Sequence, residues 1–497
     1  MSQLGSGGFG IVHVWRNSVT GQCYALKKCK LGSDITMTAR YFEIIILSTI
    51  HTYLCFCNYC RHKEAWVREV DIMQRLDHPG VVSCVPTPPG LDQGDTDLPT
   101  LCMEFCEAGD LRRELNKVES CRGLPQNQVL EILNDVVSAL GYLHNRRIIH
   151  RDLKPENVVM KGTEARTVYK LIDLGYAKEL GVSSLARSFV GTLQYVAPEL
   201  FQEHDYTKSV DYWSLGLLCH EIVTGQRPFL PNMSPGQWID YVECKKYEDI
   251  SVIQDIQGEV KYLKNLNKDT LVCPPLARML EEWLRSLLDW NSSSRGRDGD
   301  DNIIVFTKLN SILTQRWISV FCTALGKTLH FSVHQHPTVQ TLLVSLSNTL
   351  GTSSTDTLML LTKTGTRLKT TDGTESVIVD KNTAQPDIFL YNIGAHSLNK
   401  IVNIPDLVKV ALTDTKRSLQ DYHQKIMFVQ GFHFINEHFE NMKHLIFSIK
   451  LLKSYLSSKL EAVSELAKRM VPDKEKMETK YEMYKECFQV GIRIILF

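Results

Sequence analysis

The feature that most restricts the fold is a run of apolar residues near the C-terminus, spaced alternately four and three positions apart. Only Lys453 interrupts the run over six heptads, and its other members are Phe428, Phe432, Ile435, Phe439, Met442, Ile446, Ile449, Leu456, Leu460, Val463, Ala467 and Met470. This spacing places them on one narrow stripe of a single long helix that packs on a partner helix. Pro472 then ends or kinks the helix. We therefore predict a helical segment within residues 403–497, arranged as a hairpin, a bundle or a dimer. The alternative is a helix packed within its own domain.

The composition excludes several classes of protein. The 497 residues include 56 basic and 56 acidic side chains, with 43% hydrophobic and 23% charged residues. These values are typical of a globular chain of about three domains, and they argue against a disordered, membrane-embedded or dedicated nucleic-acid-binding protein. Fourteen cysteines without regular spacing indicate a reducing compartment. We expect a cytoplasmic protein, with the nucleus left open as a second location.

The first part of the chain alternates short apolar runs with turn residues and then changes to helical patterns. Apolar residues recur at helix spacing from Val129 to Leu143, immediately before a polar cluster. Residues 291–302 are polar and contain glycine, which is the composition of a surface loop or linker. We therefore expect a first domain over residues 1–300 that is strand-rich and then helix-rich.

A different pattern begins at Trp317. Two runs of period two, separated by a turn containing Gly326, predict a β-hairpin. A helix pattern and two further strands follow, giving the order strand (318–322), strand (329–333), helix (339–350), strand (358–361) and strand (388–393). Residues 315–396 are therefore predicted to form a small α+β domain.

Two features near the N-terminus favour phosphate binding. Residues 5–12 (GSGGFGIV) form a glycine-rich loop in which Gly5, Gly7 and Gly10 let backbone amides approach phosphate oxygens closely. Lys27, on the next apolar run, can neutralise the α- and β-phosphates of a nucleotide. Each signal is weak alone, since a strand lysine is usually a solvated surface charge, but the two strengthen each other.

Residues 150–157 (HRDLKPEN) are the most specific chemical signal. Asp152 would accept or orient the proton of an attacking hydroxyl, and Asn157, five residues later on the same loop, would hold a magnesium ion. Lys154 would lie near the transferred phosphoryl group. Asp173, sixteen residues beyond Asn157, adds a second oxygen ligand suited to Mg²⁺.

The order of these residues resembles that of eukaryotic-type protein kinases, and residues 197–199 (APE) and 211–214 (DYWS) extend the match. The resemblance implies a multidomain α+β chain that begins with a bilobal protein kinase fold and uses ATP and Mg²⁺. It also implies that Glu199 pairs with Arg295 and that Asp211 supports the catalytic loop. For the nucleotide it implies a gatekeeper, Met103, and contacts from Leu4, Gly5, Gly7, Gly10, Val12, Ala25, Lys27, Glu104 and Cys106.

Further details resemble serine/threonine kinases rather than tyrosine kinases. Lys154 follows the catalytic aspartate, and residues 191–192 (GT) precede the APE motif. Arg151 beside Asp152 resembles kinases whose activation loop is ordered by phosphorylation. We therefore expect Ser184 and Ser188 to be phosphorylated, in preference to the alternative that they are two solvated loop serines.

A closer resemblance, to the IκB kinases of the alpha and beta type, is carried by residues 103–111, 174–180 (LGYAKEL), 188–195 (SFVGTLQY) and 227–231 (RPFLP). It implies phosphorylation of inhibitor proteins of NF-κB, and so a role in NF-κB signalling and innate immunity. It also implies that the α+β unit is a ubiquitin-like β-grasp domain and that the long helix belongs to a truncated scaffold and dimerisation domain. The implied partners are a second catalytic subunit, in a homo- or heterodimer, and a regulatory scaffold subunit whose binding segment is absent; neither nucleic acid nor membrane is expected.

Two departures from the family pattern bear on activity. The chain starts only four residues before Gly5, so we expect an almost absent first strand and an incomplete N-terminus. Residues 66–73 (WVREVDIM) resemble the helix that carries the partner of Lys27, which makes Glu69 that partner. However, 42 residues separate Lys27 from Glu69, where roughly fifteen suffice.

The surplus lies at about residues 41–61 and is apolar. Its Cys55, Cys57 and Cys60 lack the paired spacing of zinc sites, and a membrane span there would separate two residues that must meet in one site. We interpret the segment as non-native sequence, such as a translated intron, which amplification of the transcript would test.

Two alternatives to an active IκB-type kinase are considered. A kinase-fold scaffold with weak catalysis would fit the short N-terminal strand. A kinase of the related TANK-binding type would share the domain order, but the pair Ser184 and Ser188 argues against it.

Overall fold

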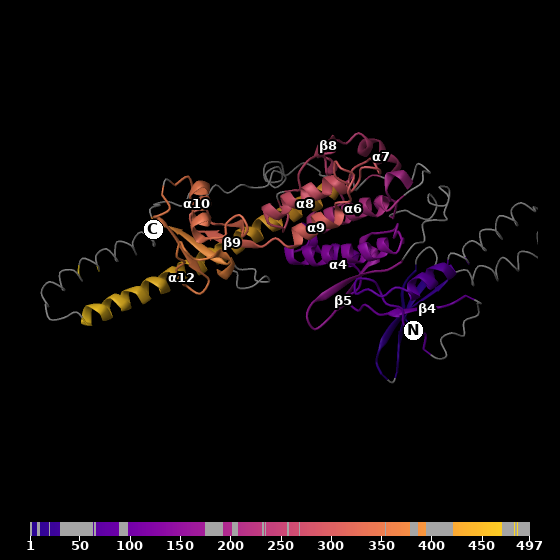
Figure 1. The fold of residues 1–497 in the computed structure, drawn as a ribbon, viewed down its shortest axis with the longest axis horizontal. Helices are drawn as coiled ribbons and strands as arrows, with labels where there is room; N and C mark the ends of the chain where they lie inside the picture. The colour runs from indigo at the N-terminus through magenta and orange to yellow at the C-terminus, as the bar shows by residue number, and fades with distance from the viewer. Residues whose placement is uncertain are drawn as a thin grey trace, which may run out of the picture. The chain divides into compact units, whose positions relative to one another are not determined.

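In a computed structural model, the structure describes residues 2–6, 10–18, 20–29, 63, 66–88, 98–173, 192–200, 207–230, 233, 235–255, 258–267, 269–352, 354–377, 386–393, 421–469, 482 and 485. The chain divides into two compact units, Met1–Leu313 and Thr314–Phe497, which are described separately (Figure 1). The predictions that concern residues 41–61 and Pro472 lie outside the described residues.

A four-stranded antiparallel sheet opens the first unit. Its strands follow chain order, as β1 (Ser2–Ser6), β2 (Gly10–Arg16), β3 (Cys23–Cys29) and β4 (Leu101–Glu104). The expectation of an almost absent first strand is wrong, because β1 pairs with β2 from Ser2 opposite Val14 to Ser6 opposite Ile11. Five residues suffice for a strand of ordinary length when a neighbour supplies the ladder.

A helix lies beside β3, one of the two inner strands of this sheet. β3 lies between β2 and β4, and its Ala25, Leu26 and Lys27 are all buried. Residues 66–74 are helical, with Trp66, Val70 and Met73 buried. This i, i+4, i+7 spacing forms one apolar face, which fixes the side of the helix that turns inward.

Helices dominate the rest of the first unit. The helix predicted before the polar cluster is present as α4 (Gln126–Asn145), with Val129, Leu133, Val136, Leu140 and Leu143 fully buried. α6 (Ser209–Thr224) is buried on every side and ends at Gly225, whose φ of 74° forms a left-handed cap. The other elements are α3 (Leu111–Leu115), α7 (Pro235–Glu243), α8 (Pro274–Leu287), α9 (Val305–Leu313), the strand pair β7 (Ser251–Gln254) and β8 (Val260–Leu263), and short 3₁₀ turns at Val118–Ser120, Pro155–Asn157, Thr192–Tyr195 and Pro198–Leu200.

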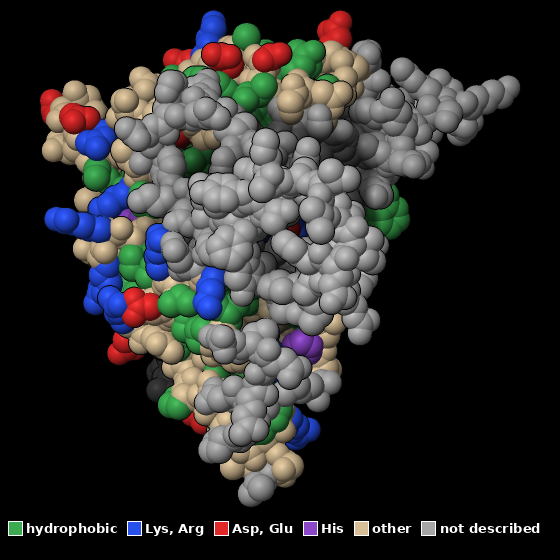
Figure 2. Space-filling model, turned by 90° about the vertical axis from the view of Figure 1, so that its right-hand side faces the viewer, with side chains coloured by type: hydrophobic (Ala, Val, Ile, Leu, Met, Phe, Trp, Pro, Cys, Tyr) green, Lys and Arg blue, Asp and Glu red, His purple; other side chains and the backbone are tan. Residues whose placement is uncertain are grey.

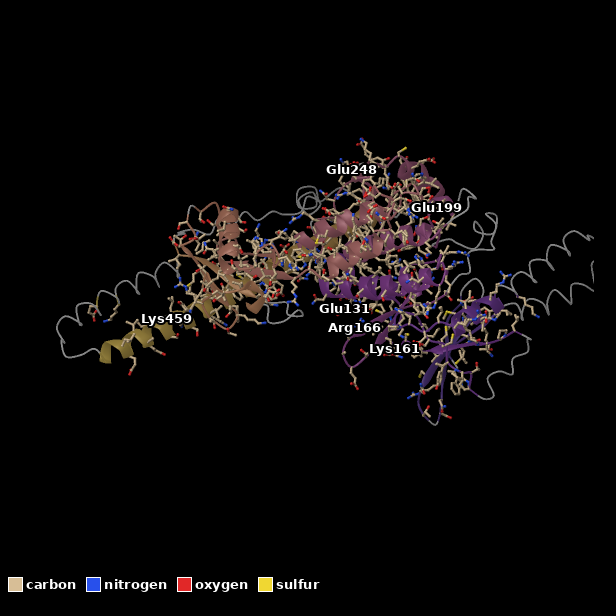
Figure 3. The ribbon with its side chains drawn as sticks, viewed as in Figure 1. Glu131, Lys161, Arg166, Glu199, Glu248 and Lys459 are labelled. Atoms are coloured by element: carbon tan, nitrogen blue, oxygen red, sulfur yellow. The ribbon has the colours of Figure 1, made fainter. Side chains whose placement is uncertain are left out.

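A β-hairpin connects α4 to the N-terminal sheet. Its strands are β5 (Val158–Gly162) and β6 (Thr167–Leu171), and Lys161 and Arg166 come from this hairpin (Figure 3). Arg166 donates to both oxygens of Asp135 on α4, at 2.6 and 2.7 Å. The segment around Val81 bridges to Leu171 on one side and, through Cys84, to β4 on the other. The hairpin is therefore held by α4 on one side and, through the segment of Val81 and Cys84, by the N-terminal sheet on the other.

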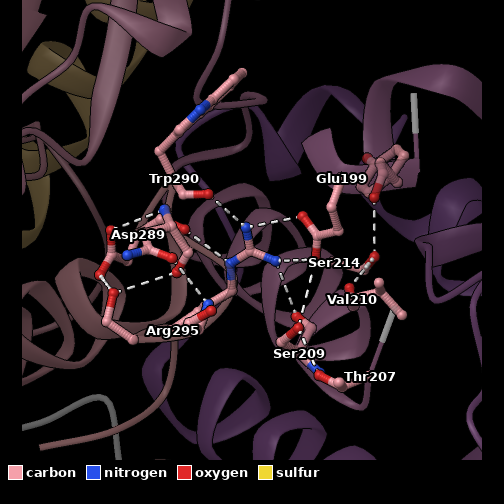
Figure 4. A network of polar contacts seen from close by, with 12 residues as sticks. Glu199, Thr207, Ser209, Val210, Ser214, Asp289, Trp290 and Arg295 are labelled. Atoms are coloured by element: carbon pink, nitrogen blue, oxygen red, sulfur yellow. Dashed lines mark hydrogen bonds and ion pairs between the residues drawn. The ribbon is translucent and has the colours of Figure 1, made fainter. Parts of the chain in front are cut away.

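The first compact unit extends beyond the boundary expected near residue 300. Residues 291–302 are a loop within the first unit rather than a linker, because Arg295 is buried there and donates to Glu199 at 2.6 and 3.1 Å (Figure 4). Beyond this loop, α9 buries Val305, Leu309 and Ile312, and the unit continues to Leu313. The polar composition of the loop does not reveal this anchor, but the kinase resemblance predicted the pair of Glu199 and Arg295, and the pair is present.

The predicted order of strands and helix is present in the second unit. The elements are β9 (Trp317–Cys322), β10 (Lys327–Ser332), α10 (Val339–Leu350), β11 (Leu358–Thr362), a 3₁₀ turn at Thr374–Val377 and β12 (Ile388–Asn392). The sheet order is β10-β9-β12-β11, with β9 and β12 parallel. Ile318, Val320 and Cys322 are fully buried on one face with α10, as the period-two pattern predicts.

A single long helix, α12 (Asp421–Arg469), confirms the helix predicted from the heptad spacing. However, the stripe used to predict it is largely exposed, with Ile435 at 66% and Phe439 at 57% exposure. A different face of α12 packs on the sheet, where Leu451 joins a cluster with Phe321 and Phe389. The sheet and the helix thus belong to one compact unit, whereas residues 315–396 and 403–497 were expected to be separate domains.

Two further features of the described residues are the distribution of surface charge and the character of the helices. Charged side chains of both signs are spread over the described part of the face in Figure 2, in keeping with the equal numbers of acidic and basic residues. Among the described residues, no helix combines the length and the apolar character needed to cross a membrane.

Removing one partner of the Glu199–Arg295 pair should destabilise the first unit. Arg295→Met leaves a buried carboxylate without its counter-charge, which costs about 3–5 kcal/mol, and we expect a lower thermal unfolding midpoint. The double variant Arg295→Met/Glu199→Gln should recover part of this loss, since it leaves no buried unpaired charge. A double variant less stable than Arg295→Met would contradict the interpretation.

Candidate active site

The site centres on the ammonium group of Lys27 on β3. Its Nζ lies 2.8 Å from Glu69 Oε1 on the helix of residues 66–74, so the predicted pair is present. It also forms an ion pair with Asp173, which follows β6. Burial opposes the positive charge of Lys27, but the two carboxylates outweigh it and raise the pKa of Lys27. Lys27 is therefore a permanent cation that joins three segments distant in sequence.

The catalytic loop brings three predicted residues together. Lys154 Nζ lies 2.6 Å from Asp152 Oδ2. The side-chain nitrogen of Asn157 donates to the backbone oxygen and to Oδ2 of Asp152, both at 2.8 Å. The amide of Asn157 thus turns its nitrogen to Asp152, and its oxygen is the atom suited to a cation.

Asp211 holds this loop in shape from within the core. Its carboxylate is fully buried on α6 and accepts the backbone N–H groups of His150 and Arg151 at 2.9 and 2.7 Å. It also lies 2.7 Å from Nε2 of His144. Arg151 has a φ of 68°, a conformation that costs a non-glycine residue about 1 kcal/mol or more. Two hydrogen bonds to a buried carboxylate can offset that cost, which is the supporting role expected for Asp211.

The strand ladder aligns the residues expected around the nucleotide. Val12 lies opposite Lys27 on the neighbouring strand, and Ala25 lies opposite Met103. Gly5 lies opposite Val12 on β1, and Gly10 begins β2. Leu4 is 54% exposed. Of the other residues predicted for this site, Gly7, Ser184 and Ser188 lie outside the described residues.

Glu104, at the end of β4, has a role that the sequence did not reveal. Its carboxylate lies 2.5 Å from Lys161 on β5 and 2.7 Å from Lys170 on β6, and accepts the N–H of Ser83 at 2.9 Å. Burial opposes the charge, yet these three donors lower the pKa of Glu104 from 4.5 to about 2. The side chain therefore ties the segment of Glu104 and Cys106 to the β5–β6 hairpin.

Arg112 on α3 makes a second unexpected network. It donates to Glu156 beside the catalytic loop at 2.8 Å, to Glu221 on α6 at 2.7 Å and to the hydroxyl of Tyr195 at 2.6 Å. Nothing in the local sequence around Arg112 distinguishes it from a solvated arginine. It joins the catalytic loop to the turn Thr192–Tyr195 through the core.

The comparisons with known proteins agree with this geometry. The model of the protein kinase domain matches residues 1–297. The chain belongs to the protein kinase family. This match ends near the boundary expected from the sequence, although the compact unit that contains the kinase domain continues to Leu313.

The kinase relatives include the IκB kinases. The chain is 35% identical to "Inhibitor of nuclear factor kappa-B kinase subunit beta" of Mus musculus over 503 residues, covering 99% of this chain and 63% of that protein. It is 38% identical to the alpha subunit of Xenopus tropicalis over 360 residues, covering 72% of this chain and 45% of that protein. The chain thus spans less than two thirds of the length of the curated relatives it matches.

A more distant likeness is found among solved structures. The "Crystal structure of Rad53 1-466 in complex with AMP-PNP" matches with a TM-score of 0.41 and 22% identity, covering 63% of each chain.

Replacing Glu104 should have a pH-dependent effect on stability. A carboxylate whose pKa is lowered from 4.5 to about 2 stabilises the fold fully above pH 4.5 and loses this contribution as the pH falls toward 2. The shift corresponds to at most roughly 3 kcal/mol, and solvent screening around the partly exposed Lys161 reduces this value. Glu104→Gln should therefore lower the thermal midpoint at pH 6, and the gap between variant and parent should narrow below pH 4.5. Glu107→Gln, which removes an exposed carboxylate from the same segment, should change the midpoint little.

Proposed function

We propose that the chain is an ATP-dependent serine/threonine kinase of the IκB kinase type that phosphorylates inhibitor proteins of NF-κB. One observation carries the catalytic part of the proposal: Lys27 binds both Glu69 and Asp173, which are 42 and 146 residues away from it. This pairing sets the phosphate-binding lysine beside a metal-binding carboxylate. The similarity to the beta and alpha subunits supports the substrate class.

The residues of the site fit ATP and Mg²⁺. The carboxylate of Asp173 and the amide oxygen of Asn157 are hard oxygen donors of the kind that Mg²⁺ prefers. Gly5, Gly7 and Gly10 would cover the phosphates, Lys27 would bind them and Glu69 would orient Lys27. When bound, Mg²⁺ neutralises charge on the phosphates. Backbone groups of Glu104 and Cys106 would hold the adenine.

Asp152 and Lys154 would perform the chemical step with the nucleotide in place. Asp152 accepts the proton of the substrate serine as the serine oxygen bonds to the γ-phosphorus. The bond from that phosphorus to the bridging oxygen of ADP breaks, and ADP is the leaving group. Lys154, held 2.6 Å from Asp152, lies where it can neutralise charge on the phosphoryl group in transit.

The proposal extends to the second unit and to its partners. A sheet in the order β10-β9-β12-β11 with a parallel central pair and one helix on its face supports a ubiquitin-like β-grasp domain. The exposed apolar stripe of α12 supports a scaffold helix that is covered in a homo- or heterodimer. A regulatory scaffold subunit and a cytoplasmic location complete the proposal.

Asp152→Asn should abolish most of the kinase activity. Losing a positioned general base reduces the rate by about 10²–10⁴-fold, measured as transfer of phosphate from ATP to a serine peptide with the IκB sequence. Asp356→Asn, which alters an exposed aspartate of the second unit, serves as the matched control and should keep the parental rate. Equal rates for Asp152→Asn and the parent would instead favour a kinase-fold scaffold. A generic peptide phosphorylated as fast as the IκB peptide would contradict the substrate proposal.

Ser184 and Ser188 should control the activity. We expect mass spectrometry of the active protein to find phosphate on one or both serines, and Ser184→Ala/Ser188→Ala to reduce the rate at least tenfold, because the phosphate can no longer pair with Arg151. Ser293→Ala, in another loop of the same unit, is the control. Full activity of the double variant would exclude this form of regulation.

A further inference from the structure

We propose that Trp66 is a positioning residue for Lys27: its indole holds the helix of residues 66–74 to the chain just before β4 and places its ring beside the Lys27 ammonium. The inference rests on the proposed function, because it concerns the nucleotide site of a kinase. It adds a residue to that site which is neither a nucleotide contact nor a member of the motif series.

Glu69 is far from Lys27 along the chain. Lys27 and Glu69 are 42 residues apart, and β3 ends at Cys29. Sequence separation by itself does not determine where two such distant residues meet, since the entropy of closing a loop changes only slowly with its length. The placement of Glu69 beside Lys27 must therefore depend on contacts that the helix itself makes.

Trp66 makes a specific contact of this kind. Its side chain is fully buried, and its Nε1–H donates to the backbone oxygen of Pro99 at 2.8 Å. Pro99 lies two residues before Leu101, which is the residue opposite Lys27 in the β3–β4 ladder. The hydrogen bond thus fixes the first turn of the helix beside the paired residues Lys27 and Leu101.

The helix geometry transmits this contact to Glu69. Trp66 and Glu69 are three residues apart, so both side chains lie on the same face, together with Val70 and Met73. All four are buried. Because the indole is the largest apolar group on this face, its burial turns the face inward and carries the Glu69 carboxylate with it.

The Trp66 ring also lies beside the ammonium of Lys27. Lys27 Nζ lies 5.7 Å from the centre of the Trp66 ring, within the range of a cation–π interaction. An ammonium group has three N–H donors, and in the described part of the chain Glu69 and Asp173 engage it as acceptors. A ring face attracts the charge without taking a donor, so the Trp66 ring does not compete with a phosphate oxygen for an N–H of Lys27.

Trp66→Phe tests the inference because it keeps an aromatic ring but removes the Nε1–H and weakens the cation–π interaction. We expect the Kd for ATP, measured by calorimetry, to rise about tenfold, and the KM for ATP to rise similarly. The KM for the peptide should not change. The matched control is Trp283→Phe on α8, because Trp283 is also fully buried and its Nε1–H donates to the backbone oxygen of Val305 at 3.0 Å. It loses the same kind of bond far from Lys27 and should keep the parental Kd.

A double-variant cycle separates positioning from general stability. If Trp66 acts through Lys27, Trp66→Phe should change the Kd for ATP less than twofold when Lys27 is already replaced by methionine. An equal loss of affinity in both backgrounds, or an equal loss for Trp66→Phe and Trp283→Phe, would overturn the proposal. The cycle measures nucleotide binding, so a parent that binds ATP but transfers no phosphate would refute the proposed function without deciding this inference.

Discussion

The ammonium of Lys27 and its two carboxylate partners hold the site together. Glu69 comes from the helix and Asp173 from the segment after β6, so three segments converge on one buried charge. Taking such a charge out of water is costly unless the geometry of its partners is good. The fold must therefore bring a carboxylate to Lys27 from elsewhere in the chain, and here it brings two, Glu69 and Asp173.

The catalytic loop of the site depends on α6, as the Lys27 cluster depends on its carboxylates. This helix has no exposed face, and from it Asp211 reaches the backbone of the catalytic loop. Two residues further along α6, the ring of Trp213 lies under the guanidinium of Arg295, which in turn binds Glu199. One buried helix thus supports both the loop that carries Asp152 and the loop of residues 291–302 that carries Arg295. The backbone N–H groups of His150 and Arg151 both donate to Asp211, which helps Arg151 to keep an unfavourable φ.

The sequence predicted those parts of the site whose residues stand in an ordered series of motifs, including the pairing of Lys27 with Glu69. The lysine partners of Glu104 were not predictable from any local pattern. They depend on how the β5–β6 hairpin packs against the end of β4, which brings Lys161 and Lys170 to Glu104. The long helix was predictable from its heptads, but the face that packs on the sheet was not. A heptad stripe identifies an apolar surface without naming its partner, and here Leu451, outside that stripe, makes the contact.

β4 links the two positioning side chains that sequence reasoning missed. It is only four residues long, and Trp66 holds the chain just before it through Pro99. At its other end, Glu104 ties it to Lys161 and Lys170. A strand fixed at both ends by one side chain each cannot shift without breaking a buried polar contact. The helix and the hairpin are therefore coupled through β4, and the backbone that would face the adenine lies on this coupled strand.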